Sequence, residues 1–315
     1  MLNVLVCFRL ILNYMTDDWS LEYIEEELAI KEAYAQKGWK ISQLLVVMSF
    51  TQYIMFMVAT PFIPKIIDMI MPLNETRKPT LFFKAYYIVD EEKYFALLMF
   101  YNLLVITVVM CFAIGNQAAF WIILQHLCGM AAVLGYRLQN IFPKNAFTLQ
   151  ANKQDRTPFK EGCFYKSIVL CVQRHNQISK FTKLVNAYYL PASLSQLFFF
   201  VIYLGSSFLQ FFDPQLRDYI SVSHLYYAVI FMVINCYIGQ VFINLMDELS
   251  NQIFFTKWYD CPPASQKIVL MLIRCYNVPH GLSIYKIFYL SFSSLKMVIQ
   301  SATSYFLIFK KVKYN

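Results

Sequence analysis

Charged residues are scarce in this chain. Asp, Glu, Lys and Arg make up 15% of its 315 residues, whereas soluble domains contain about a quarter. Hydrophobic residues account for 58% and stand in long blocks separated by charged segments. Because a membrane-spanning helix needs about 20 mostly apolar residues, the pattern predicts an all-α, multi-spanning membrane protein. The blocks are too continuously apolar for the alternating strands of a membrane β-barrel.

The sequence motifs of common catalytic and metal-binding sites are also missing. Only eight glycines occur, and the sequence contains no P-loop, G-x-G-x-x-G, G-x-S-x-G or H-E-x-x-H motif. None of the eight cysteines forms a C-x-x-C pair, and most lie in or beside apolar blocks, which argues against a metal site or a disulfide framework. We therefore expect no enzyme activity, no catalytic residue, no metal and no cofactor.

The apolar blocks predict one membrane domain over 1–315. The expected spans are a partial one at 1–14, then 41–63, 94–136, 184–212, 225–246 and 281–309. The first block is too short to span alone, so it reads as the tail of a helix whose beginning is absent. Between it and the next span, 16–40 is charged and amphipathic, with Thr16 or Asp17 as the expected helix cap.

The block Tyr94–Tyr136 allows two interpretations. It holds 43 residues without a Lys, Arg, Asp or Glu. As one helix it would be about 65 Å long, roughly twice the hydrocarbon core of a bilayer. It is either a hairpin of two spans broken near Gly115, which the residues alone favour, or one long helix that continues into the cytoplasm.

The net charge of +8 is best explained by basic cytoplasmic loops rather than by nucleic-acid binding. The segment 137–183, a predicted polar loop, carries nine Lys or Arg and two acids, which places it in the cytoplasm. If 94–136 crosses once, 64–93 is outside, the sequon at Asn74 is usable for glycosylation, 247–280 is inside and the carboxyl terminus is outside. If it crosses twice, 64–93 is inside and the sequon is silent.

Two sets of residues are candidates for function. In the single-crossing orientation, the outer halves of three spans carry bulky side chains that would form an apolar pocket for a small ligand. These are Tyr53, Phe56, Met57, Met99, Phe100, Asn102, Tyr226, Tyr227 and Ile230. Ordinary core or lipid-facing packing is the alternative. The last span is rich in Ser, Thr and Tyr around Ser301 and Ser304, so it is expected to face something polar, such as a pore.

Several stretches together resemble the insect odorant receptor family. They are Asp18-Trp19 before an acid-rich helix, His126–Gly129 followed by Leu134–Leu138, Lys257–Tyr259 with Pro262, Gln266-Lys267, and Met297–Ser301 leading into Ser304–Phe306. The resemblance extends over nearly the whole chain and is most specific in its C-terminal part.

This resemblance implies an odorant-gated, non-selective cation channel in the plasma membrane of olfactory sensory neurons. Members have seven spans and a cytoplasmic amino terminus, and odorant-specific subunits form tetramers with a shared co-receptor. The expected ligand is a small hydrophobic volatile molecule. The family's long fourth helix favours a single helix over 94–136, and the loop 137–183 is short for the co-receptor itself. By this comparison the chain lacks the first span and part of the second.

The resemblance also assigns roles in the last helix, which would line the pore. Tyr305 matches the family's signature tyrosine, and Ile308 falls where a hydrophobic gate is expected. Lys310 and Lys311 stand where related receptors carry Gln, and 264–276 would belong to a cytoplasmic anchor that holds subunits together. A gustatory-type receptor channel and a G-protein-coupled receptor are the alternatives. The sequence does not identify the odorant.

Overall fold

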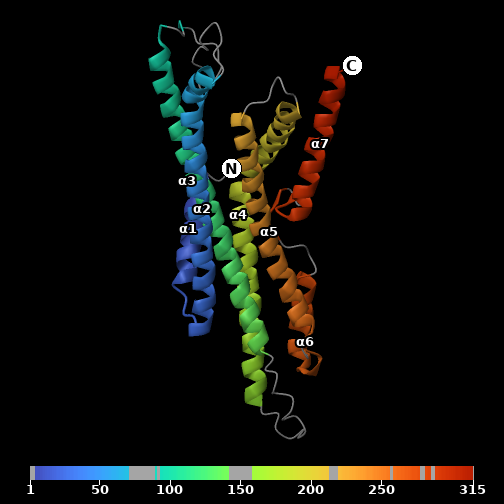
Figure 1. The fold of residues 1–315 in the computed structure, drawn as a ribbon. Coiled ribbons are helices and arrows are strands. Elements are labelled where there is room, and N and C mark those ends of the chain that lie inside the picture. The colour runs from blue at the N-terminus through green and yellow to red at the C-terminus, as the bar shows by residue number, and fades with distance from the viewer. Residues whose placement is uncertain are drawn as a thin grey trace. The chain divides into compact units, whose positions relative to one another are not determined.

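The computed structural model describes residues 4–70, 89–90, 93–141, 158–212, 219–255, 258–276, 281–284 and 288–314, and most of them are helical (Figure 1). The α-helices are α1 (Val4–Trp19), α2 (Glu25–Ile70), α3 (Phe95–Ile141), α4 (Pro158–Phe212), α5 (Tyr219–Phe254), α6 (Pro263–Tyr276) and α7 (Phe292–Tyr314). A 3₁₀ turn, η1 (Trp258–Asp260), precedes α6. Strands β1 (Ser283–Ile284) and β2 (Phe288–Tyr289) form an antiparallel hairpin in which Ser283 pairs with Tyr289. The predicted all-α fold class is confirmed.

Contacts gather in two compact units, although the sequence suggests one domain. Unit 1 comprises Met1–Trp39, Ile122–Phe199 and Val233–Ile299, and unit 2 comprises Lys40–Trp121, Phe200–Met232 and Gln300–Asn315. Helices α2, α3, α4, α5 and α7 each contribute residues to both units, whereas α1 and α6 belong to unit 1 alone.

Helix α3 contains the long uncharged block 94–136 apart from its first residue. It runs for 47 residues as one helix through Gly115, so the hairpin interpretation is wrong. Within the described residues, four helices are long and apolar enough to cross a membrane, namely Glu25–Met57, Phe95–Ile141, Pro191–Phe208 and Leu225–Phe254. Helix α7 is not among these four, because Lys, Ser, Thr and Gln interrupt its apolar residues. Which helices cross the bilayer stays a prediction.

The segment 137–183 is mostly helical rather than a loop. Helix α3 continues to Ile141, and α4 begins at Pro158 and runs for 55 residues through the expected span at 184–212. Proline at the first helical position lacks only an N–H that would be unpaired there in any case. Buried positions recur three residues apart at Ile168, Cys171 and Arg174 and further along α4. The charged segment is therefore an amphipathic helix with one buried face.

The last helix also begins later than expected, so 281–309 does not form one helix. The hairpin occupies its first part, and α7 starts at Phe292 because Ser291 caps it. The backbone N–H of Ser294 donates to Ser291 Oγ at 3.3 Å. A Cβ at Gly239 would lie 2.2 Å from the carbonyl oxygen of Leu290, so only glycine lets the chain pass so close to α5 at this point.

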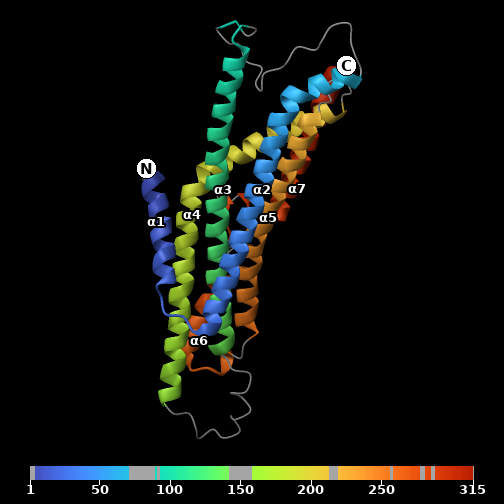
Figure 2. The ribbon, with the colours of Figure 1, turned by 60° about the vertical axis from the view of Figure 1, so that its left-hand side comes forward.

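The predicted cap at Thr16 or Asp17 is also wrong. Both residues lie inside α1, where Thr16 Oγ1 donates to the carbonyl of Asn13, and α2 begins at Glu25. The first turn of α2 holds Glu25, Glu26 and Glu27, which the positive end of the helix dipole favours. Figure 2 shows α1 lying along α4, where the Tyr14 hydroxyl donates to the carbonyl of Gln177 at 3.0 Å.

A buried carboxylate, Asp18, ties the helices of unit 1 together. Its side chain is 2% exposed and pairs with Lys31 Nζ of α2 at 2.7 Å and with Nη1 of Arg174 of α4. His126 Nε2 of α3 lies 3.3 Å from Asp18 Oδ2. One carboxylate therefore contacts three other helices.

The cations around Asp18 are themselves held by protein groups. Lys31 Nζ donates to the backbone carbonyl of Asp18 at 2.8 Å and lies 4.3 Å and 4.1 Å from the ring centroids of Trp19 and Tyr23. Arg174 Nη2 donates to the Tyr23 hydroxyl at 2.7 Å, and that hydroxyl donates to Asp18 Oδ1 at 3.0 Å. These contacts compensate for the water that burial removes from the charges.

Burial and the neighbouring groups shift the pKa of Asp18 in opposite directions. Burial alone would raise the pKa of this carboxyl, but the nearby His126 and the charge and hydrogen bond of Arg174 outweigh it. The pKa of Asp18 is therefore held well below its ordinary value, and the group is charged at neutral pH. A neighbouring bidentate pair joins α2 to α3: Arg137 Nε and Nη2 donate to Glu27 Oε1 and Oε2 at 2.7 and 2.8 Å.

Substituting Asp18→Asn should destabilise the protein strongly. The change removes the negative charge and leaves the buried cations Lys31 and Arg174 uncompensated, which costs about 3–5 kcal/mol. The matched control is Asp17→Asn, because Asp17 is the next residue in α1 and is exposed. Thermal unfolding of the detergent-solubilised variants measures both effects. Equal losses from the two substitutions would refute the role of Asp18.

Candidate functional site

The residues predicted to bind a ligand all belong to unit 2, on α2, α3 and α5. Two hydroxyl pairs connect these helices. The hydroxyls of Tyr53 on α2 and Thr107 on α3 lie 2.6 Å apart. Thr107 Oγ1 also bonds to the carbonyl of Leu103, at 2.7 Å. Hydroxyls inside apolar helices often bridge neighbouring helices in this way.

The second pair joins α2 to α5. Ser49 Oγ and the Tyr227 hydroxyl lie 2.8 Å apart, and Ser49 is completely buried. The Tyr227 ring stacks on Phe231 at 6.0 Å between centroids, and Phe231 lies 6.2 Å from Trp121 of α3. An aromatic row therefore extends from the hydroxyl pair to α3.

The remaining predicted residues differ in exposure. Asn102 is 3% exposed, whereas Phe100 and Tyr226 are 58% and 70% exposed in the chain. The half-buried side chains are Phe56, Met57, Met99 and Ile230. The structure thus brings Tyr53 and Tyr227 to their helix contacts, and it places Phe100 and Tyr226 on the surface of unit 2. Their role in ligand binding stays a prediction.

Ser49 and Thr107 were not among the residues predicted to line the pocket. Each is a single hydroxyl within an apolar helix, and such a residue gives no sign of its partner until the helices are placed side by side. Their presence changes the chemistry of the region. A mostly apolar set of side chains there carries hydroxyls that can donate or accept a hydrogen bond.

The predicted pore residues share one face of α7. Ser301, Ser304, Tyr305 and Ile308 follow the spacing i, i+3, i+4, i+7, and Lys311 continues the same stripe. All five are exposed, with Tyr305 at 52% and Ile308 at 60%. Only the stripe's location is established, and its lining of a pore stays a prediction.

Another face of α7 packs within unit 2. Ala302 is fully buried and Phe306 is 8% exposed. The Phe306 ring lies 6.1 Å from Phe208 of α4. A Cβ added to Gly205 of α4 would lie 3.8 Å from Tyr305 Cβ, so the two helices approach closely here. The predicted glycosylation residue, Asn74, lies outside the described residues.

The two hydroxyl pairs should respond differently to loss of the tyrosine hydroxyl. Tyr227→Phe leaves the buried Ser49 hydroxyl without its partner and should cost about 1–3 kcal/mol. Tyr53→Phe should cost at most about 1 kcal/mol, because Thr107 keeps its bond to Leu103. Thermal unfolding in detergent compares them. A smaller loss for Tyr227→Phe than for Tyr53→Phe would show that the Ser49 contact contributes little.

Comparisons with known proteins agree on one family. The family described as 7tm Odorant receptor matches residues 8–303. No curated protein matches the chain. Among solved structures, the olfactory receptor OR5 of the insect Machilis hrabei, in complex with eugenol, superposes with a TM-score of 0.71 at 12% identity. Another structure of that receptor gives a TM-score of 0.62 at 14% identity.

Each of these superpositions covers 97% of this chain and 74% of the receptor. At such low identity the likeness concerns the fold, and it agrees with the predicted receptor-like helical bundle. The family match covers nearly the whole sequence. The chain belongs to the 7tm odorant receptor family.

Proposed function

We propose that this odorant receptor is the odorant-binding subunit of a ligand-gated, non-selective cation channel in olfactory sensory neurons. The observation that carries the proposal is the exposed stripe on α7 from Ser301 to Lys311. It combines two serine hydroxyls, a tyrosine and an isoleucine on one face, while a different face packs on α4. This stripe is exposed in the single chain. Such a helix is suited to line a pore that several chains form together.

The proposed ligand is a small, hydrophobic, volatile molecule. The candidate residues on α2, α3 and α5 are mostly aromatic or aliphatic, so affinity would come from burying apolar surface at about 25 cal/mol per Å². The hydroxyls of Ser49, Tyr53, Thr107 and Tyr227 supply the polar contacts that would orient the ligand. Because these hydroxyls already join the helices, a ligand that bonds to one of them competes with a helix contact. Binding would then alter helix packing, as gating requires.

The proposed partner is the family's co-receptor, in a heterotetramer. A stripe that ends in Lys311 would place a ring of positive charge at the mouth of a pore built from four copies of this chain. Such a ring opposes cation passage. Mixing this chain with co-receptor subunits lowers the number of lysines in the ring, which favours a mixed assembly over four identical subunits.

Location in the plasma membrane and orientation belong to the same proposal. The excess of Lys and Arg in 137–183 supports a cytoplasmic location for the end of α3 and the start of α4, and the carboxyl terminus would then be extracellular. A tag placed after Asn315 should be stained in unpermeabilised cells. Staining that requires permeabilisation would contradict this orientation and favour the opposite one of G-protein-coupled receptors.

The channel proposal is tested by expressing the receptor with and without the co-receptor in the same cells. A panel of small hydrophobic volatiles should evoke cation currents that reverse near 0 mV only in the co-expressing cells. Surface staining of the tagged receptor confirms that both cell populations display it. Currents of equal size without the co-receptor would refute the partner, and responses carried only by second messengers would refute the channel.

The gate prediction concerns Ile308. If this side chain closes the pore by excluding water, Ile308→Ser should admit water and raise the ligand-independent current several-fold in co-expressing cells. The matched control is Leu307→Ser, because Leu307 is similarly exposed, at 58%, but lies about 100° around the helix from Ile308. Whole-cell recording measures the basal current. Equal increases from both substitutions would indicate general disruption of α7 rather than a gate.

A further inference from the structure

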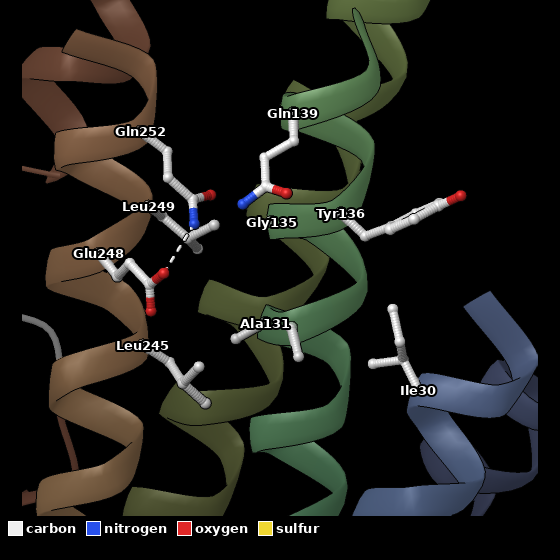
Figure 3. A pocket seen from close by; sticks show the side chains of 10 residues that line it. Ile30, Ala131, Gly135, Tyr136, Gln139, Leu245, Glu248, Leu249 and Gln252 are labelled. Carbon is white, nitrogen blue, oxygen red and sulfur yellow. Dashed lines mark hydrogen bonds between the residues drawn. The ribbon is translucent and has the colours of Figure 1, made fainter. Parts of the chain in front are cut away.

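A groove in unit 1 contains a buried polar atom without a hydrogen-bond partner, and none of the proposed odorant-site residues lines it. It lies between α3 and α5, beside the start of α2 (Figure 3), and has a volume of about 230 Å³. It is smaller than the usual site for a drug-sized molecule, so it suits a ligand of a few heavy atoms.

The groove exists because α3 has small residues where it faces α5. Ala131, Ala132 and Gly135 lie along this side of α3, and Leu245 and Leu249 of α5 supply the apolar wall opposite. A Cβ added to Gly135 would lie 3.2 Å from Leu249 Cδ2 and 3.4 Å from Gln252 Oε1. Because residue 135 is glycine, the groove extends down to the α3 backbone and the Gln252 amide can lie directly over it.

On the polar side of the groove, one buried acceptor receives no hydrogen bond. Gln252 Nε2 donates to Glu248 Oε1 at 2.9 Å, whereas the buried Gln252 Oε1 has no hydrogen-bond partner. In Figure 3 the Gln139 side chain points toward Gln252 across Gly135, yet no hydrogen bond joins them. Within the described part of the chain, Glu248 forms no ion pair.

We propose that this groove binds a small organic molecule that carries a primary ammonium group on a short apolar chain. An ammonium has three N–H donors and a positive charge, which match the Glu248 carboxylate and the Gln252 carbonyl oxygen. The short chain lies against Ala131, Leu245 and Leu249. An alcohol of the same length could donate to Gln252, but it leaves the Glu248 charge without a counter-charge.

The alternative occupant is water, with Gln139 turning to donate to Gln252. In that case the groove is an ordinary hydrated gap between helices and has no preference for a charged ligand. The two possibilities differ in a measurable way, because a hydrated gap binds an amine and an alcohol of equal length equally weakly.

Binding is tested on the purified full chain in detergent with n-hexylamine, which is protonated at pH 7. Isothermal titration calorimetry should show saturable binding at least tenfold tighter than that of 1-hexanol. Glu248→Gln removes the charge, keeps the shape and should weaken hexylamine binding at least tenfold. Asp247→Asn is the matched control, because Asp247 is the neighbouring exposed acid of α5 and does not line the groove. It should leave the affinity unchanged.

Ala132→Leu gives an independent test, because the larger side chain fills the groove without touching its charge. It should abolish hexylamine binding while thermal unfolding confirms that the variant is folded. Equal affinities for hexylamine and hexanol, or unchanged hexylamine binding in Glu248→Gln, would overturn the proposal. Both measurements are made without co-receptor or current, so their failure leaves the channel proposal unaffected, and failure of the channel proposal leaves this one standing.

Discussion

The buried carboxylate of Asp18 sets the arrangement of the helices in unit 1. A single charge removed from water is costly, and only nearby cations and donors make its burial tolerable. Those partners come from α2, α3 and α4, with Arg174 separated from Asp18 by 156 residues. The end of α1 can therefore be buried only where the other three helices supply their side chains together. Apolar packing alone leaves helices freer to slide and rotate, so we expect the buried ion cluster to favour one register.

The polar contacts that join helices differ between the two units. In unit 1, charged groups join helices, as in the Asp18 cluster and the Glu27–Arg137 pair. In unit 2, neutral hydroxyls do so, as in Tyr53–Thr107 and Ser49–Tyr227. Burying an ion within hydrocarbon costs several kcal/mol, whereas a hydroxyl pair between helices contributes modestly and costs little to desolvate. If unit 2 binds the ligand as proposed, its weaker links would allow its helices to rearrange on binding.

Sequence reasoning succeeds here where local composition is decisive and fails where a distant contact decides. The 14-residue helix α6 was visible in the amphipathic pattern of 264–276. At 94–136 the residues alone favoured a break near Gly115, and only the family resemblance favoured the single helix that α3 forms. The start of α4 was missed because its basic residues resemble a loop, and their helical role depends on a buried face that meets α1 and α6. One such contact is His175 against Tyr276, whose ring centroids lie 4.7 Å apart. The late start of α7 was missed because the β1–β2 hairpin and the Ser291 cap lie within an apolar stretch that resembles a single span. For the candidate site, the aromatic residues were predictable by type, but Ser49 and Thr107 became relevant only once their partner helices were placed.

The uncovered stripe of α7 follows from how little room its packed face needs. Ala302 and Gly205 let α7 approach α4 closely, so a narrow strip of small side chains and Phe306 is enough to hold the helix. The other faces of α7 do not take part in this packing, so their residues can serve another role. Contact with lipid would favour aliphatic side chains along the whole stripe, since an ammonium group such as that of Lys311 is costly in hydrocarbon. Ser301, Ser304 and Lys311 are instead suited to water. If α7 spans the membrane, neighbouring chains would have to enclose the water that such a stripe faces, and this is the physical argument for the proposed channel.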